Sequence, residues 1–243
     1  MEPFSRTQLL LGSDAMEKLK NARVAVFGLG GVGGYVVEAL ARSGVGALDL
    51  VDHDTVSITN INRQLFALHS TVGMPKADAA AARVLDINPQ CKVTAHKTFY
   101  GPDTAEIFDF SQYDYIIDAI DTVTAKLALI ARAKAAGTPI LCCLGTGNKL
   151  DASKFQITDI SKTSVCPLAR VMRKECAKRG LKGVKVLFST EDPIPSREES
   201  TEELPEGRRS LPGSVAFVPS VAGLLIAGEV IRDLTCQKLK IDK

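Results

Sequence analysis

The sequence predicts an α/β fold built on a doubly wound, mostly parallel β-sheet with helices on both faces. Three observations support this prediction. Short apolar runs of strand length alternate with longer helical stretches through most of the chain, which is typical of βα units. A glycine-rich loop follows the first apolar run directly. The 243 residues, 45% of them hydrophobic, are enough to bury a sizeable core.

The first predicted unit is a strand, a glycine loop and a helix. Residues 23–27 form the strand, because apolar residues follow Arg23 without interruption. Residues 31–43 form the helix, whose apolar side chains recur on one stripe: Val32, Val36, Val37 and Leu40. A second strand at residues 48–51 ends directly before Asp52.

Two further helices are marked by the signals at their ends. In the helix of residues 75–87, Pro75 fits the first turn and the Asn-Pro pair that follows ends the helix. In the helix of residues 122–136, Thr122 occupies the N-cap and Gly137 ends the helix. The strands predicted around these two helices comprise residues 93–95, 115–119 and 140–144.

The alternation changes after Gly147, where we expect a smaller C-terminal lobe. Its predicted elements are a strand at 155–160, a basic helix at 167–179 and a strand at 184–188. Residues 191–209 are acidic and interrupted by prolines, and they cannot bury enough apolar surface to order themselves. We therefore expect a mobile loop at 191–210. Residues 215–231 are apolar but contain Pro and Glu, which favours a core helix over a membrane span.

Composition excludes several classes of protein. The net charge is +2, so any contact with nucleic acid must come from a local patch. An aromatic content of 5% without Trp argues against a stacking-based binder of single strands. No apolar run follows a basic start in residues 1–21, and we expect a cytoplasmic protein. The six cysteines form no Cys-x-x-Cys pair, so we expect no zinc site.

The glycine loop predicts a nucleotide site in a Rossmann-like fold. It reads Gly28-Leu-Gly30-Gly31-Val-Gly33 and lies between a predicted strand and a predicted helix. Glycines there let backbone N–H groups approach phosphates at a helix N-terminus. Asp52 follows the next strand, where its carboxylate can accept hydrogen bonds from ribose hydroxyls. NAD is the default nucleotide for this pattern.

The polar segment after the second strand favours a triphosphate over NAD. It contains Asn60, Arg63 and Gln64, and Lys76 follows. Arg63 and Lys76 supply cations for phosphate oxygens and for the charge that develops at the α-phosphorus. Asp121, near the carboxyl end of a predicted strand, is placed to hold Mg²⁺.

Together these residues resemble the E1-like ATP-dependent adenylating superfamily, which includes the ubiquitin-activating enzymes and the molybdopterin- and thiamine-synthesis adenylyltransferases. The matching residues are Gly28, Gly30, Gly31, Gly33, Asp52, Asp54, Asn60, Arg63, Gln64, Lys76 and Asp121. The resemblance implies an ATP-binding Rossmann-type domain at residues 1–150. Residues 151–243 would then form a C-terminal lobe that continues the same fold.

A closer resemblance extends over nearly the whole chain. The segments that resemble the tRNA threonylcarbamoyladenosine dehydratase family are residues 5–7, 60–64, 118–121, 145–149, 162–168 and 213–223. That family cyclises the modified adenosine next to the anticodon. ATP activates the threonyl carboxylate, AMP and pyrophosphate are released, and the substituent closes on itself with loss of water. The resemblance implies the same activity here, with tRNA as the substrate.

The resemblance also implies roles for the matching residues. All of the residues named for the superfamily would contact ATP, with Asp52 on the ribose and the glycines on the phosphates. Arg63 and Lys76 would be catalytic, and Asp121 would be the catalytic acid associated with Mg²⁺. Arg6 matches an N-terminal arginine that reaches the ATP of the other subunit in a homodimer. An ion pair within its own subunit stays open as the alternative.

Two departures from the superfamily pattern favour the tRNA branch. Thr122 follows Asp121 where many E1-like enzymes have Asn, and the two Cys-x-x-Cys pairs of many members are absent. Two other functions stay open. One is an adenylyltransferase that activates the C-terminal glycine of a small sulfur-carrier protein, and the other is an NAD-binding oxidoreductase. A sulfur-transfer protein also stays open as a partner.

The predicted basic helix offers candidates for tRNA binding. They are Arg170, Arg173, Lys174 and Lys178. Phosphate contacts from such a cluster would hold an RNA backbone, and an ordinary solvated helix face is the competing interpretation. Cys166 lies at the predicted start of this helix, where a covalent thioester role and a structural role both stay open.

Overall fold

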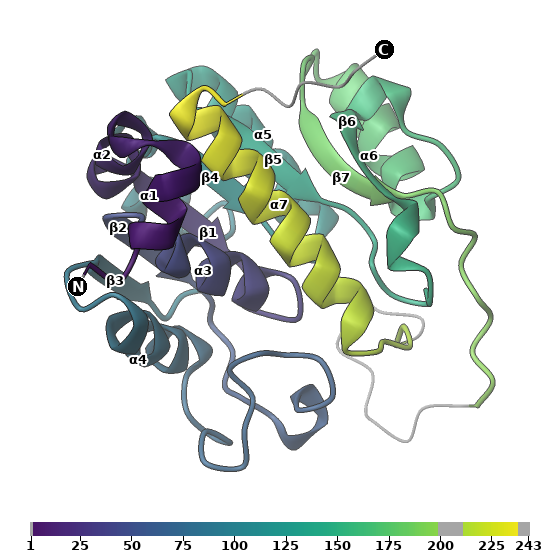
Figure 1. The fold of residues 1–243 in the computed structure, drawn as a ribbon. Coiled ribbons are helices and arrows are strands. Elements are labelled where there is room, and N and C mark those ends of the chain that lie inside the picture. The colour runs from purple at the N-terminus through teal and green to yellow at the C-terminus, as the bar shows by residue number, and fades with distance from the viewer. Residues whose placement is uncertain (1, 199–210, 238–243) are drawn as a thin grey trace.

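A single mixed sheet organises the chain. The computed structural model describes residues 2–198 and 211–237, and its seven strands lie in the order β3-β2-β1-β4-β5-β7-β6 (Figure 1). The strands are β1 (Arg23–Phe27), β2 (Ala47–Val51), β3 (Lys92–His96), β4 (Tyr115–Asp118), β5 (Ile140–Cys143), β6 (Phe155–Asp159) and β7 (Lys185–Ser189). All neighbouring strands pair in parallel except β6 and β7, which are antiparallel. The predicted doubly wound, mostly parallel α/β fold is confirmed.

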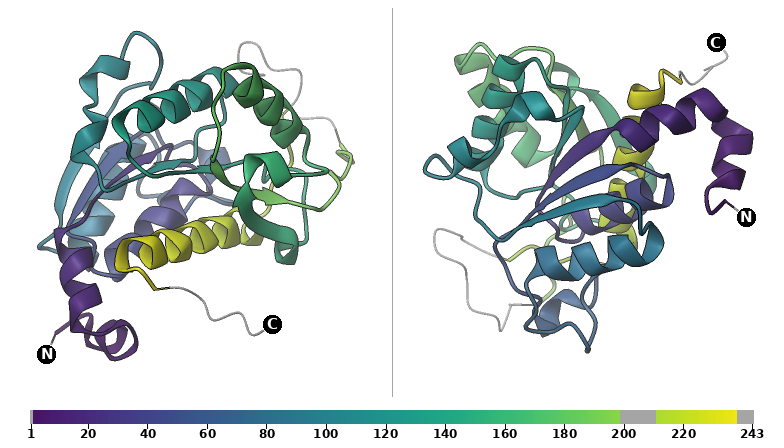
Figure 2. Two further views of the ribbon diagram at one scale, coloured as in Figure 1. Left: turned by 90° about the horizontal axis from the view of Figure 1, so that it is seen from above. Right: turned by 90° about the vertical axis from the view of Figure 1, so that its left-hand side faces the viewer.

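Helices cover both faces of the sheet (Figure 2). One face is covered by α3 (Gly33–Arg42), α4 (Lys76–Ile87) and α7 (Phe217–Thr235), whose apolar side chains share one core with β1 and β2. The other is covered by α5 (Val123–Ala136) and α6 (Pro167–Lys178), which share a second core with β4 and β5. The short 3₁₀ helices are η1 (Ile58–Asn60), η2 (Ala105–Ile107), η3 (Phe110–Gln112), η4 (Ala152–Lys154) and η5 (Ile160–Lys162).

The end signals in the sequence locate the helix boundaries well. Pro75 is the N-cap of α4, and Gly137 adopts a left-handed conformation (φ +72°) at the end of α5. Thr122 is the N-cap residue of α5, as predicted. Its hydroxyl does not cap the helix, however, and donates to the carboxylate of Asp121 instead (3.3 Å).

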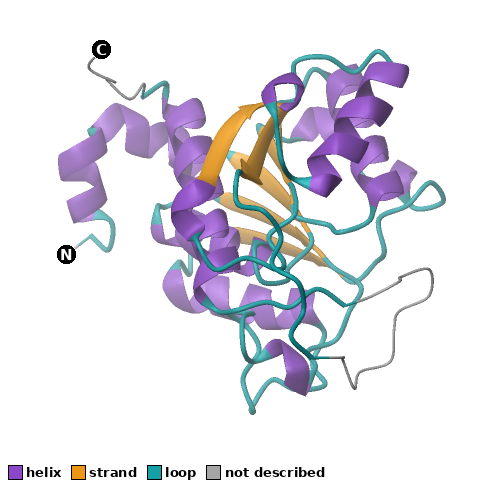
Figure 3. Cartoon of the chain, turned by 90° about the vertical axis from the view of Figure 1, so that its right-hand side faces the viewer, coloured by secondary structure: helices purple, strands orange, loops and turns teal. Residues whose placement is uncertain are grey.

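Two N-terminal helices were not expected from the sequence. They are α1 (Ser5–Leu11) and α2 (Ser13–Asn21), separated by Gly12 at φ +86°. Figure 3 shows them projecting from one end of the molecule. None of the residues of α1 is fully buried, and Leu11 at its C-terminal end is partly buried against the core.

The C-terminal helix returns to the N-terminal half of the chain. α7 packs along α3 so closely that a Cβ added to Gly223 would lie 2.5 Å from the carbonyl oxygen of Val32. The buried residues of α7 include Val218, Ala222 and Ile226, in agreement with the predicted core helix. Among the helices described, none combines the length and the apolar character needed to cross a membrane. Most of the loop expected at 191–210 lies outside the described residues, which resume at Leu211.

The sheet order places a crevice beside β1. The chain leaves β1 for β2 on one side, and β4 pairs with β1 on the other. Such a switch point opens a gap between the connections at the carboxyl ends of the two strands, which is where open α/β sheets bind ligands. The glycine loop follows β1 and residues 119–121 follow β4, so both lie at this edge.

Candidate functional site

The glycine loop is held tightly against the segment after β4. Gly28 has φ +89°, and a Cβ there would lie 2.7 Å from the carbonyl oxygen of Ala119. A Cβ on Gly33 would lie 1.8 Å from the carbonyl oxygen of Gly28. Only glycine fits these two positions, because any side chain would displace backbone. The result is a compact turn that presents backbone N–H groups at the N-terminus of α3.

Asp52 joins the end of β2 to this loop. Its Oδ2 accepts a hydrogen bond from the N–H of Leu29 (2.7 Å), and its Oδ1 accepts one from the N–H of Asp54 (2.9 Å). The carboxylate is half-buried and therefore fixed beside the glycine loop. This is the position from which an acid after the second strand reaches a ribose.

An ion pair joins the two ends of the segment between β2 and α4. Nζ of Lys76 lies 2.7 Å from Oδ2 of Asp54, and the backbone N–H of Lys76 donates to the carbonyl of Asp54 (2.9 Å). Lys76 is only 6% exposed, whereas the Asp54 side chain is half exposed. The ammonium is thus largely buried, and its partner is the more exposed carboxylate of Asp54.

Arg63 and Gln64 lie directly over the glycine loop. The position of a Cβ on Gly31 is 3.5 Å from Cγ of Arg63, and that on Gly30 is 3.8 Å from Nε2 of Gln64. The two side chains predicted for the triphosphate are therefore brought to the loop predicted for it. Asn60 has a local role as well, because its Oδ1 accepts the N–H of Ser57 (3.1 Å) and closes the capping box of η1.

The two carboxylates after β4 are in different environments. Asp121 is exposed in the turn before α5, next to the segment that touches Gly28. Asp118 is fully buried, with both carboxylate oxygens 3.1 Å from Nζ of the equally buried Lys126. Burial alone would lower the pKa of Lys126, but the Asp118 carboxylate outweighs it and raises that pKa, so the ammonium stays charged. Asp118 therefore supports the turn from inside the core and is not part of the exposed surface of the turn.

One group of potential metal ligands lies at the same edge. Asp52, His53 and Asp54 each offer a ligand atom within 4.8 Å of the others. Asp52 and Asp54 already accept the hydrogen bonds described above. His53 lies at the surface with its ring edge-on to Phe99 (5.0 Å between centroids).

Arg6 is not brought to this site within its own chain. It lies on α1, and the residue that anchors α1 is Phe4, whose ring packs against Gly44 after the far end of α3 (3.2 Å from a built Cβ). The glycine loop is at the other end of α3, which is about 15 Å long for its ten residues.

The four candidates for tRNA binding divide into two groups. Arg170, Lys174 and Lys178 are exposed and follow one another at intervals of four residues, so they share one face of α6. Arg173 is half-buried, and its Nη1 donates to both the carbonyl (2.6 Å) and the hydroxyl (2.7 Å) of Thr163. Cys166 is the N-cap residue of α6 and is 2% exposed.

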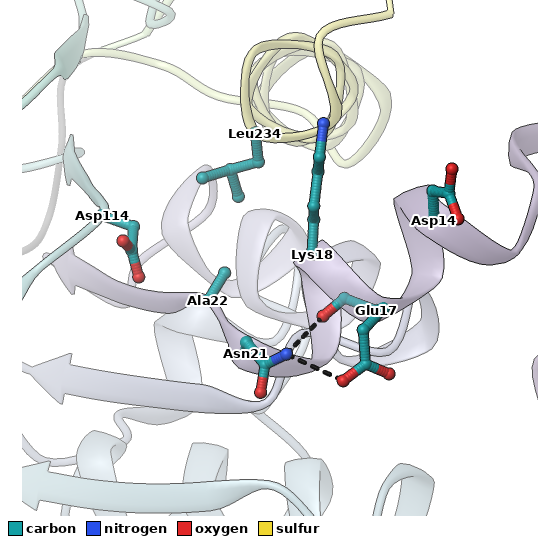
Figure 4. A pocket seen from close by; sticks show the side chains of 7 residues that line it. All are labelled: Asp14, Glu17, Lys18, Asn21, Ala22, Asp114 and Leu234. Atoms are coloured by element: carbon teal, nitrogen blue, oxygen red, sulfur yellow. Dashed lines mark hydrogen bonds between the residues drawn. The ribbon is translucent and has the colours of Figure 1, made fainter.

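A hollow of about 500 Å³ lies at the opposite end of the sheet, near the amino ends of the strands. Figure 4 shows its lining, which comes from α2, the residues before β1 and β4, and Leu234 of α7. Asn21 donates there to both the carbonyl and the carboxylate of Glu17 (2.9 Å each). Ligands of open α/β sheets bind at the carboxyl ends of the strands, so this hollow at the amino ends is not the candidate site.

Two supporting residues were given no role in the sequence analysis. Asn62 donates to the carbonyl of Ser214 (3.0 Å) and accepts a hydrogen bond from Arg63 (2.8 Å). Lys126 pairs with Asp118 and donates to the carbonyl of Cys143 (2.6 Å). A lysine in an otherwise apolar helical stripe was a signal for Lys126. The position of Asn62 gave none, because its partner is 152 residues away.

Comparison with known proteins identifies the family of the chain. The sequence model of the ThiF family matches residues 4–241. The tRNA threonylcarbamoyladenosine dehydratase of Bacillus subtilis (strain 168) is 48% identical over 96% of this chain and 95% of its own length. Crystal structures of the E. coli tRNA N6-threonylcarbamoyladenosine dehydratase TcdA have TM-scores of 0.86 in complex with AMP and with ATP. The AMP complex is 35% identical over 96% of this chain and 94% of its own, and the ATP complex 34% identical over 98% and 96%. The chain belongs to the ThiF family and, within it, to the group of the tRNA threonylcarbamoyladenosine dehydratases.

Proposed function

We propose that this protein is an ATP-dependent enzyme that cyclises N6-threonylcarbamoyladenosine in tRNA by adenylating its threonyl carboxylate. The observation that supports this most directly is the convergence of Asp52, Arg63 and Lys76 around the glycine loop at the switch point of the sheet. A dinucleotide does not need two cations beyond its ribose site, whereas a triphosphate does. The dehydratases that the chain resembles match it over nearly its whole length.

ATP occupies the crevice between the connections after β1 and β4. Asp52 accepts hydrogen bonds from the ribose, and the backbone of the glycine loop binds phosphate oxygens at the N-terminus of α3. Arg63, Gln64 and Lys76 hold the β- and γ-phosphates, and Asn60 offers its NH₂ group. Residues 1–150 supply these contacts. β7 and β6 extend the sheet, and α6 beside them binds tRNA.

The reaction has two steps. A carboxylate oxygen of the threonyl group attacks the α-phosphorus of ATP, the bond to the β-phosphate breaks, and pyrophosphate leaves. A nucleophilic atom of the same substituent then attacks the acyl carbon, and AMP leaves with the former carboxylate oxygen. Arg63 and Lys76 offset the charge that develops on the phosphate oxygens. The net change is the loss of one water from the nucleoside and the conversion of ATP to AMP and pyrophosphate.

Asp121 is the residue that would hold Mg²⁺. Its carboxylate is exposed at the switch point, and carboxylate oxygens are the ligands that Mg²⁺ prefers. When bound, the ion would neutralise phosphate charge and orient the triphosphate.

In a homodimer, Arg6 acts at the ATP site of the partner subunit. Leu9 and Leu10 of α1 are 88% and 85% exposed, which is costly in water and favours burial against a second copy. Arg6 lies on the same helix and cannot reach its own chain's site past α3, so it serves the site of the partner. Mixing two inactive variants, Arg6→Ala and Asp121→Ala, should restore part of the activity, because one site of a mixed dimer is then intact. No restoration, with exchange of subunits verified, would contradict this arrangement.

Mass spectrometry of nucleosides tests the function directly. Purified protein and ATP–Mg²⁺ are added to tRNA that contains threonylcarbamoyladenosine, with Asp121→Ala as the control. Loss of one water that depends on ATP and is absent in the control supports the proposal. No mass change in the nucleoside, with ATP converted to AMP when a sulfur-carrier protein is supplied, would transfer the assignment to the sulfur-carrier branch. Binding of NAD in preference to ATP would indicate an oxidoreductase.

A further inference from the structure

Asn62 connects the predicted phosphate-binding arginine to the C-terminal part of the chain. Its Oδ1 accepts a hydrogen bond from Nη1 of Arg63 (2.8 Å), and its Nδ2 donates to the carbonyl oxygen of Ser214 (3.0 Å). Both ends of one carboxamide are therefore in use. The two partners are neighbours only in space, since Ser214 is 152 residues further along the chain than Asn62.

The hydrogen bond to Asn62 holds one edge of the Arg63 guanidinium. Nη1 also donates to the carbonyl oxygen of Thr59 (2.9 Å), so both of its N–H groups are directed at acceptors. A guanidinium has five N–H donors in a fixed plane. Three of them thus have no acceptor within the part of the chain that the structure describes. Holding one edge leaves the other edge oriented for phosphate oxygens.

Ser214 offers a firm attachment point. The preceding residue, Gly213, exchanges two hydrogen bonds with Asn148, one from the N–H of Asn148 to its carbonyl (2.8 Å) and one from its own N–H to Oδ1 of Asn148 (2.6 Å). Shortly after Ser214 the chain enters α7, where Pro219 lies 3.2 Å from the position of a Cβ on Gly31. The segment is fixed on both sides of Ser214, and one of these contacts is the glycine loop itself.

We propose that Asn62 is a positioning residue that orients Arg63 over the glycine loop by anchoring its guanidinium to residues 213–214. The assignment rests on the proposed function only in naming the triphosphate as the group that Arg63 binds. It adds a requirement that neither the glycine loop nor Arg63 supplies alone. The phosphate-binding arginine depends on the lobe that follows residue 150, through a single side chain.

A double-mutant cycle between Asn62 and Arg63 tests this. If Asn62 acts through Arg63, Asn62→Ala should raise the Kd for ATP and lower kcat/KM by about tenfold, while the same change in an Arg63→Ala background should cost less than about twofold. Asn62→Asp retains the acceptor for Arg63 and loses the donor to Ser214, so it separates the two hydrogen bonds. Asn62 is exposed, so the thermal midpoint should move little.

Asn21→Ala is the matched control, because Asn21 is an exposed asparagine whose carboxamide also makes two hydrogen bonds, both donated by Nδ2, near the amino ends of the strands. Equal costs of Asn62→Ala in both backgrounds would overturn the proposal, as would an effect no larger than that of Asn21→Ala. The Kd for ATP is measured by titration without tRNA. The cycle can therefore be scored even if the nucleoside assay shows no dehydration and the proposed function fails.

Discussion

The ammonium of Lys76 lies 2.7 Å from the carboxylate of Asp54, so the 21-residue segment between them begins and ends at one ion pair. The pair is asymmetric, since the lysine is 6% exposed and the Asp54 side chain is half exposed. A buried ammonium beside the crevice is a strong partner for phosphate, because little water competes for it. Asp54 neutralises that charge in the structure.

Replacing Lys76 should therefore affect ATP more than the fold. We expect Lys76→Met to lower kcat/KM for ATP by about 100-fold, the usual range for removing one group that stabilises transition-state charge. The matched control is Lys97→Met, which breaks the exposed ion pair of Lys97 with Asp78 (3.2 Å) and should change kcat/KM less than about twofold. Equal effects of the two substitutions would rule out a special role for Lys76.

The buried pair of Asp118 and Lys126 should be more important for stability than for binding. Lys126→Met leaves a carboxylate buried without its partner, and we expect a loss of about 3–5 kcal/mol in the free energy of unfolding. Adding Asp118→Asn should recover most of this loss, because the asparagine still accepts the N–H of Ile120 and no unpaired charge remains. Urea unfolding of both variants measures the difference. A double variant less stable than Lys126→Met would contradict the argument.

Replacing Tyr100 or Tyr115 with Phe should change the free energy of unfolding in opposite directions. The hydroxyl of Tyr100 is buried without a hydrogen-bond partner among the described residues, and burial raises its pKa to about 12. Tyr100→Phe keeps the ring in its contact with Phe27 and should raise the free energy of unfolding by about 1 kcal/mol. Tyr115→Phe should lower it by about 1 kcal/mol, because the Tyr115 hydroxyl donates to Asp233 (2.7 Å). A loss of stability in Tyr100→Phe would indicate a partner for its hydroxyl.

The carboxyl of Asp49 should make the free energy of unfolding decrease at acid pH. Burial of its carboxyl is outweighed by the hydrogen bonds from His96 and Arg23, and the pKa of Asp49 is lowered from its ordinary 3.8. A carboxyl with a lower pKa in the folded state stabilises the fold above the pKa of the unfolded chain. That contribution is lost as the pH falls below about 4. Unfolding measured from neutral to acid pH should give a flatter profile for Asp49→Asn than for the exposed control Asp103→Asn.

Local patterns in the sequence predict most of the sheet, because buried parallel strands are short apolar runs with clear ends. Residues 23–27 match β1 at both ends, since a glycine loop follows directly. α1 escaped prediction because none of its residues is fully buried, so no apolar periodicity toward a core marks it.

Roles that depend on contacts between residues far apart in the sequence cannot be predicted from local sequence patterns. Arg173 belongs to a basic run, and only the structure shows that Thr163 already holds its guanidinium. Asn62 stands beside Arg63 in the sequence, yet its role follows from Ser214. The residue types at the crevice could be predicted from their spacing, whereas the side chains that support them could not.

The exposed row on α6 gives the sharpest test of tRNA binding. Arg170, Lys174 and Lys178 lie on one helix face, and three phosphate contacts should each contribute about one unit to the slope of log K against log salt. Replacing all three with alanine should reduce that slope by about three and weaken tRNA binding, without changing the Kd for ATP. Arg173 is left in place, because its loss would also disturb the segment around Thr163.

Three exposed lysines elsewhere provide the matched control for charge. Lys18 and Lys20 lie on α2 and Lys92 lies on β3, so their replacement by alanine removes the same charge from another part of the surface. If the loss of affinity came from net charge alone, both triple variants would weaken tRNA binding equally. A localised site requires a larger change in the salt slope for the α6 variant, because only phosphates in direct contact release counterions at those side chains. Equal slopes would assign the α6 row to an ordinary solvated face.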